Sequence, residues 1–121
     1  MAIRRIVRLI GATYFLMSLI GTLVHSLPVS VLLLLFHVMM GIGGTVASQD
    51  IVSAIRFSRG TAVLLGILGP IELQLPSPAL FLSWSPLGGA VPIVHLTTAV
   101  VAAYYGFYWP DAVEKRIAGR K

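Results

Sequence analysis

Cysteine is absent from this chain of 121 residues, and acidic residues are scarce, with four aspartates and glutamates in all. The lack of cysteine excludes disulfides, thiolate metal sites and cysteine nucleophiles. Catalytic motifs are missing too: the sequence has no phosphate-binding glycine loop, no His-Glu-x-x-His, no nucleophile elbow and no carboxylate pair in its apolar segments. We therefore expect that the protein is not an enzyme.

Charge of either sign is rare, since charged residues make up 11% of the chain and hydrophobic residues 57%. A chain with this composition has too few charged residues to form the surface of a water-soluble domain. The nine basic residues, which give a net charge of +5, fall in three clusters, at 4–8, 56–59 and 115–121. Because these clusters flank long apolar stretches, we expect them to anchor in anionic lipid headgroups and not to bind nucleic acid.

The apolar stretches predict an all-α fold, an integral membrane four-helix bundle in a single domain. Each stretch is close to the roughly 20 residues that cross a hydrocarbon core about 30 Å thick. The first is expected to be retained as a helix that also directs insertion. The predicted helices cover residues 6–24, 29–47, 60–75 and 91–109, with an outer loop at 76–90 and a basic C-terminal tail at 110–121.

The basic clusters also predict the orientation in the membrane. With the amino terminus inside, all nine basic residues face the cytoplasm, whereas the reverse orientation would place all nine outside. We therefore expect both termini to be cytoplasmic. Gly69-Pro70 is expected to weaken the end of the third helix. The outer loop is rich in proline yet apolar, so we expect it to fold over the outer surface or to contact a neighbouring subunit.

The two halves of the chain show a weak two-helix pseudo-repeat. Residues 15–21 are similar to residues 63–69, and His37 in the second segment corresponds to His95 in the fourth. Two helices return the chain to its starting side, so the halves would be related by an axis along the membrane normal. The alternative is that short apolar strings spaced by glycine match by chance.

His37 and His95 are the candidate site residues. His37 lies about 12 Å into the second segment at 1.5 Å per residue, and an ionisable side chain at such a depth is a candidate for function. As tentative axial ligands, the two imidazoles would bind haem iron, or one of them a chlorophyll magnesium. The simpler interpretation is a hydrogen bond across a helix interface to Thr13, Ser18, Thr97 or Thr98.

Glu72 is the only acidic residue near a membrane segment and away from a basic cluster. A carrier of protons or cations would place its carboxylate near the membrane midplane. Glu72 follows Gly69-Pro70 at the outer end of the third segment, and no second acid accompanies it. We therefore expect it to be solvated at the outer surface or paired with a partner subunit, and a transport role is the alternative.

The segments around the two histidines resemble a family of small four-helix bacterial membrane proteins of unknown function. The similarity is clearest in Pro86-Leu87-Gly88-Gly89 with the stretch from Val94 to Phe107, and in Phe36-His37-Val38 with the glycine-rich residues 41–48. The first connection, Ser26-Leu27-Pro28, is shorter than is usual in that family. The resemblance implies the four-helix fold and a bacterial inner membrane, cytoplasmic or photosynthetic, and it singles out the two histidines. It implies no activity.

These features together favour a small accessory or structural subunit of a larger membrane protein complex, photosynthetic or respiratory. Its partners would be the lipid bilayer and the other membrane subunits. One alternative is a protein that binds chlorophyll or haem through His37, His95 or both. The second alternative is a small transporter in which Glu72 or the histidines form a relay.

Overall fold

The computed structural model describes residues 2–23, 31–74 and 90–110. Within these ranges the regular structure is entirely helical and comprises four α-helices, with a short π-helix that continues the last of them. The elements are α1 (Ala2–Leu23), α2 (Val31–Ala47), α3 (Ile51–Gln74), α4 (Ala90–Ala103) and η1 (Tyr104–Tyr108). The predicted all-helical class is confirmed. The first connection, most of the outer loop and the basic tail of the prediction lie outside the described residues.

Three helical stretches are long and apolar enough to cross a membrane: α1, α3, and α4 together with η1 (Val91–Tyr108). The apolar part of α2, Leu33–Ala47, is shorter. Large apolar side chains point outward from every helix, for example Leu16 on α1, Met39 on α2, Ile67 on α3 and Val100 on α4. Since an apolar surface of this kind is stable against hydrocarbon and not against water, the fold is consistent with a multi-pass membrane protein in contact with lipid.

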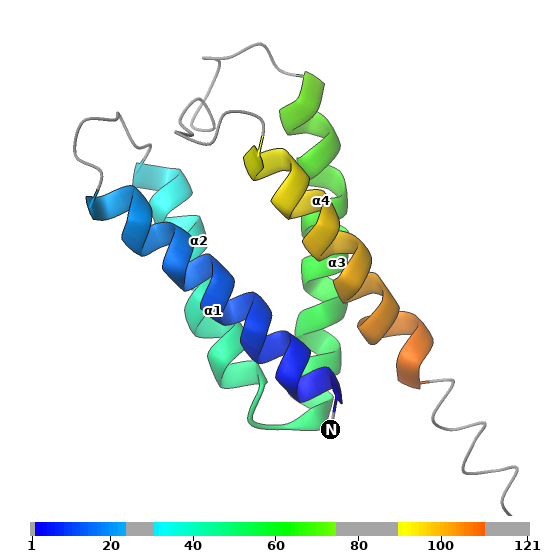
Figure 1. Ribbon diagram of the computed structural model, residues 1–121. Helices are drawn as coiled ribbons and strands as arrows, with labels where there is room; N and C mark the ends of the chain where they lie inside the picture. Colours follow the sequence, from blue (N-terminus) through cyan, green and yellow to red (C-terminus); the bar gives the residue numbers. More distant parts are fainter. Residues whose placement is uncertain (1, 24–30, 75–89, 111–121) are drawn as a thin grey trace, which may run out of the picture.

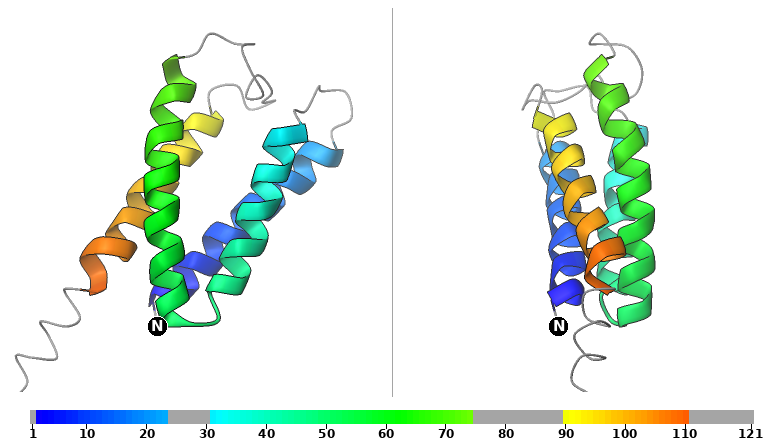
Figure 2. Two further views of the ribbon diagram at one scale, coloured as in Figure 1. Left: turned by 180° about the vertical axis from the view of Figure 1, so that it is seen from behind. Right: turned by 90° about the vertical axis from the view of Figure 1, so that its right-hand side faces the viewer.

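The helices are arranged as two hairpins, α1 with α2 and α3 with α4 (Figure 1). In Figures 1 and 2, α3 approaches the first hairpin at the end that carries the amino terminus, whereas α4 leans toward that hairpin at the opposite end, where α4 begins. The fewer contacts between hairpins than within them agree with this picture. The relative position of the two hairpins therefore depends on the few side chains that make contacts between them.

Glycine brings α1 and α2 into backbone contact. A Cβ atom built on Gly44 would lie 2.8 Å from the Cα atom of Gly11, and one built on Gly11 would lie 2.9 Å from the carbonyl oxygen of Gly41. Side chains at these positions would hold the two backbones apart. Because dispersion contacts between closely approaching helices replace the hydrophobic effect inside a bilayer, this glycine contact stabilises the first hairpin.

In the second hairpin, η1 contacts α3 through a glycine and through a hydrogen bond from Arg59. A Cβ atom on Gly106 would lie 2.9 Å from the backbone nitrogen of Arg59, so η1 and α3 are also in backbone contact. The wider turn of a π-helix disturbs the regular backbone hydrogen bonding of α4. The carbonyl oxygen of Gly106 accepts a hydrogen bond of 2.8 Å from Nε of Arg59. The guanidinium of Arg59 also lies 5.3 Å from the ring centre of Phe107.

The predicted start of the third helix is wrong. The helix begins at Ile51 and not near residue 60, so most of the segment between the second and third predicted helices is itself helical. Asp50 favours this early start, because its Oδ2 atom accepts a hydrogen bond of 2.7 Å from the backbone N–H of Ser53. Pro70 lies inside the helix, and α3 continues to Gln74, close to the predicted end at residue 75. Proline near the end of a membrane helix removes only one backbone hydrogen bond, which packing against α4 offsets.

Basic residues of α1 cap the C-terminal end of α2. Nε of Arg4 donates a hydrogen bond of 2.8 Å to the backbone oxygen of Ser48, and Nε of Arg8 lies 3.5 Å from the Ser48 hydroxyl. The last carbonyl groups of a helix carry partial negative charge and lack intrahelical partners. These two arginines therefore stabilise the first hairpin in addition to any contact with lipid headgroups.

Candidate functional site

Four helices each contribute buried side chains to one cluster where the two hairpins meet. We call it the buried histidine cluster, and it consists of Tyr14 from α1, Phe36 and His37 from α2, Glu72 from α3 and His95 from α4. Its members lie far apart in the sequence, and only the packing of the hairpins brings them together. The two histidines predicted as site residues both belong to it.

The strongest contact in the cluster joins α3 to α4. Nδ1 of His95 lies 2.7 Å from Oε2 and 2.9 Å from Oε1 of Glu72. The exposed fraction of the side chain is 0% for His95 and 3% for Glu72, so neither group is solvated. A carboxylate or an imidazolium alone at such a place would cost several kcal/mol, and the pair avoids that cost. This contact is a short hydrogen bond between two titratable groups inside the membrane domain.

Aromatic rings surround the His95 imidazole on the side of the first hairpin. The ring of Tyr14 stacks on it, with centroids 5.8 Å apart and planes inclined by 8°. Phe36 packs against it edge to face at 5.9 Å. The Tyr14 ring is fully buried, as is His95. His95 is therefore in contact with both hairpins, through Glu72 on one side and through Tyr14 and Phe36 on the other.

His37 completes the cluster from α2. Its ring centre lies 5.8 Å from that of His95 and 5.4 Å from that of Tyr14, in both cases with the rings edge to face. The side chain is buried. Within the described part of the chain, Nε2 of His37 and Nε2 of His95 are both buried without a hydrogen-bond partner. Two unpaired imidazole nitrogens in one apolar interior require an explanation, because such atoms cost free energy.

The structure corrects the predicted surroundings of the two histidines. Glu72, expected to be solvated or paired with another subunit, is buried within this chain and is the partner of His95. Ser18, expected as a possible partner from α1, instead donates its hydroxyl hydrogen to the carbonyl oxygen of Phe15 in its own helix. The sequence contained a signal for Glu72, since it continues the buried face of α3 after Leu65 and Gly69 at helical spacing. The expected weakening of the helix at Pro70 concealed that signal.

Tyr14 is a member of the cluster that sequence reasoning did not single out. It lies on the buried face of α1 with Ile10 and Ser18, at the spacing of an inward helix stripe. A tyrosine in such a stripe has the same pattern as any core residue. Nothing in the sequence indicates that its ring meets a histidine from the fourth helix.

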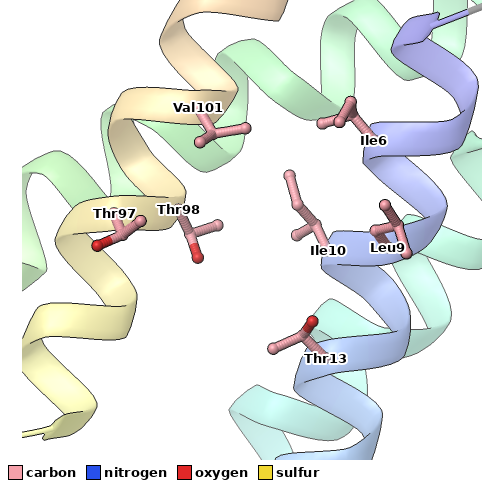
Figure 3. Close-up of a pocket in the computed structure, with 7 residues that line it drawn as sticks. All are labelled: Ile6, Leu9, Ile10, Thr13, Thr97, Thr98 and Val101. Carbon is pink, nitrogen blue, oxygen red and sulfur yellow. The ribbon is translucent and has the colours of Figure 1, made fainter.

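A shallow opening lies between α1 and α4 beside the cluster (Figure 3). In Figure 3, Ile10 and Thr13 on α1 and Thr98 on α4 point toward it from opposite walls. Its volume is about 150 Å³, and its lining residues are Ile6, Leu9, Ile10, Thr13, Thr97, Thr98 and Val101. The opening is apolar apart from the three threonine hydroxyls, and it is too small for a macrocyclic cofactor.

The cluster presents two buried imidazole nitrogens that have no hydrogen-bond partner in the described part of the chain and could act as ligands. Among the residues that the structure describes, no group of three or more histidine, aspartate or glutamate side chains is arranged to hold a metal ion. Two neutral imidazoles remain suitable as ligands of a metal that is already held in a macrocycle.

Comparison of the chain with protein-family models, with curated proteins and with solved structures yields no match. The resemblance drawn from residues 36–48 and 86–107 therefore stays a prediction. What is known of the site is its geometry: a buried carboxylate, two buried imidazoles and two aromatic rings at the contact between two membrane hairpins.

Proposed function

We propose that the protein is a small accessory subunit of a larger membrane protein complex, in which it stabilises or links other subunits. The observation that carries this proposal is the outer face of α3. Its exposed residues recur at helical spacing and form one continuous stripe: Gly60, Val63, Leu64, Ile67 and Ile71. A Cβ atom on Gly60 would meet nothing within 4 Å, so the backbone is open to close approach there. A helix of another subunit packs well on such a stripe.

The setting that we propose for this subunit follows from the sequence. The basic clusters support a position with both termini in the cytoplasm, and the family resemblance supports a bacterial inner membrane, cytoplasmic or photosynthetic. Because the family that the chain resembles occurs in photosynthetic bacteria, we prefer a photosynthetic host complex to a respiratory one. The corresponding positions of His37 and His95 in the second helix of each hairpin support a two-helix pseudo-repeat.

Purification of the tagged protein from its native membrane in a mild detergent tests the subunit proposal. We expect other membrane polypeptides to co-purify in fixed proportion. Replacement of Gly60 by leucine should reduce their recovery, because the side chain blocks the close approach of a neighbouring helix. Val100→Leu is the matched control, since Val100 is an exposed residue on α4 and the change only enlarges an apolar side chain. A lone monomer or homodimer in the wild-type preparation contradicts the proposal.

A second candidate function is the binding of a pigment or haem, and the unpaired Nε2 atoms of His37 and His95 favour it. These nitrogens would ligate the metal, and the cofactor would supply light absorption or electron transfer. Tyr14 and Phe36 pack against the same imidazoles, so a macrocycle would have to separate these rings. The absorption spectrum of the purified protein tests this function. A cofactor band should be lost in His37→Ala or His95→Ala, and an identical spectrum in all three proteins removes the candidate.

A further inference from the structure

An open groove lies between α1 and α2 on the exposed side of the first hairpin. Its volume is about 320 Å³, and its lining residues are Phe15, Gly41, Ile42, Thr45 and Val46. Gly41 is buried and has no side chain, so it leaves the groove open between its neighbours. The apolar side chains of Phe15, Ile42 and Val46 are 52%, 51% and 59% exposed. The groove is therefore an apolar depression that other side chains of the described chain leave uncovered.

The one polar side chain in the lining of the groove has its hydrogen bond inside α2. The hydroxyl of Thr45 donates a hydrogen bond of 2.9 Å to the carbonyl oxygen of Gly41. The groove therefore offers hydrocarbon and aromatic surface and no unpaired hydroxyl. An acyl chain suits such a surface, because it gains dispersion contacts there and needs no polar partner.

Two arginines lie where this groove continues toward the amino-terminal end of α1. The hydroxyl of Ser48 donates a hydrogen bond of 2.7 Å to the carbonyl oxygen of Thr45 in the wall of the groove. Nε of Arg8 lies 3.5 Å from the same hydroxyl, and Nε of Arg4 donates to the Ser48 carbonyl. Arg8 precedes Phe15 by seven residues, so both lie on one face of α1, about 10 Å apart along its axis. A continuous series of contacts thus joins the groove to both guanidinium groups.

The positive charge of these two arginines is not balanced within the described part of the chain. No carboxylate there forms an ion pair with Arg4 or Arg8. Ser48, their common partner, is uncharged, and only the Nε atoms contact it. A guanidinium has five N–H donors, so the terminal nitrogens of both side chains remain available to an anion, and phosphate oxygens match their geometry.

We propose that the first hairpin carries a binding site for one anionic phospholipid, with the phosphate on Arg4 and Arg8 and one acyl chain in the groove. The separation of about 10 Å between Arg8 and Phe15 fits this occupant, because half of a hydrocarbon core is about 15 Å thick. The site goes beyond the accessory-subunit proposal. It lies on α1 and α2 and not on the exposed stripe of α3, so either proposal can fail without the other.

Native mass spectrometry of the full chain, released from mild detergent micelles, counts the lipids that each chain retains. Phosphatidylglycerol and phosphatidylcholine with identical acyl chains are added in equal amounts. We expect one phosphatidylglycerol per chain and a preference of about tenfold over phosphatidylcholine, because the choline cation opposes the two guanidinium groups. Equal retention of the two lipids by the wild type overturns the proposal.

A pair of arginine variants tests the contact with the headgroup. Arg8→Gln should weaken the retention of phosphatidylglycerol about tenfold, because it removes a charged donor. Arg5→Gln is the matched control, since Arg5 is exposed and makes no contact with Ser48, and this variant should retain the lipid. Equal losses in both variants would show that only the overall charge matters, and they also overturn the proposal.

A pair of valine variants tests the groove. Val46→Phe should reduce the retention of phosphatidylglycerol, because the added ring occupies the place of the acyl chain. Val100→Phe is the same change on the exposed face of α4 and should have no effect. Unchanged retention in Val46→Phe assigns binding to the phosphate alone, and a dimer that this variant abolishes assigns the groove to a second copy of the chain. Either result overturns the proposal. Circular dichroism checks the helices, and the wild-type comparison of the two lipids decides the question if a variant does not fold.

Discussion

The contact between Gly44 and Gly11 makes a quantitative prediction about the first hairpin. Alanine at position 44 would place a Cβ atom 2.8 Å from Cα and 2.9 Å from the backbone nitrogen of Gly11, whereas ordinary contacts begin at 3.4 Å. Both atoms belong to backbone, so no side-chain rotation relieves the overlap. The two helices must separate by about 0.6 Å, the difference between 3.4 and 2.8 Å. Overpacking of this kind destabilises a protein by about 1–3 kcal/mol.

Gly60→Ala is the matched control for Gly44→Ala. It is the same chemical change in a membrane helix, but nothing lies within 4 Å of the added Cβ atom. We expect this variant to be as stable as the wild type or slightly more stable, because alanine favours the helix over glycine. Unfolding in mixed micelles, followed by circular dichroism, measures the difference. Equal stability of the two variants would refute the conclusion that backbone contact at glycine holds α1 against α2.

Three further predictions concern other contacts. Arg4→Met should destabilise the first hairpin by about 1 kcal/mol in the same unfolding assay, because it removes the hydrogen bond to the Ser48 carbonyl. Gly106→Ala should destabilise the second hairpin by about 1–3 kcal/mol, because its Cβ atom would lie 2.9 Å from the backbone of α3. Hydrogen bonds from the hydroxyl and backbone N–H of Ser53 hold the pKa of Asp50 below its usual value. The stabilisation by Asp50 is therefore present at neutral pH and lost as the pH falls below about 4, and amide exchange in the first turn of α3 should show this step in the wild type but not in Asp50→Ala.

The order of the helices was predictable because it depends on local composition. The gaps between basic clusters predicted four apolar helices, and the described part of the chain contains them. The start of α3 was less predictable. Arg56 and Arg59 made residues 49–59 resemble a polar connection between helices, yet Ala54 and Ser58 on the same stretch are fully buried. One helix can carry a polar face and a buried face. Only the packing of the buried face against another helix shows that the segment is helical and not a polar connection.

The candidate site was predictable in part. The depth of His37 and its correspondence to His95 identified both histidines from the sequence. Their neighbours could not be identified in the same way. Tyr14 has the pattern of an ordinary core residue, and Glu72 follows a proline that was expected to weaken the helix. The carboxylate joins the site because α3 remains helical beyond Pro70 and its buried face reaches α4.

The sequence by itself determined the class of the protein. Scarce charge, absent cysteine and long apolar stretches are properties of composition, and the hydrophobic effect converts them into membrane helices whatever the helices later contact. Tertiary structure alone decided that a carboxylate, two imidazoles and a tyrosine share one interior. The physical reason is that the packing of the helices selects which buried side chains contact one another. The glycines set how closely each pair of helices approaches, and this approach determines which buried polar groups come within hydrogen-bond distance.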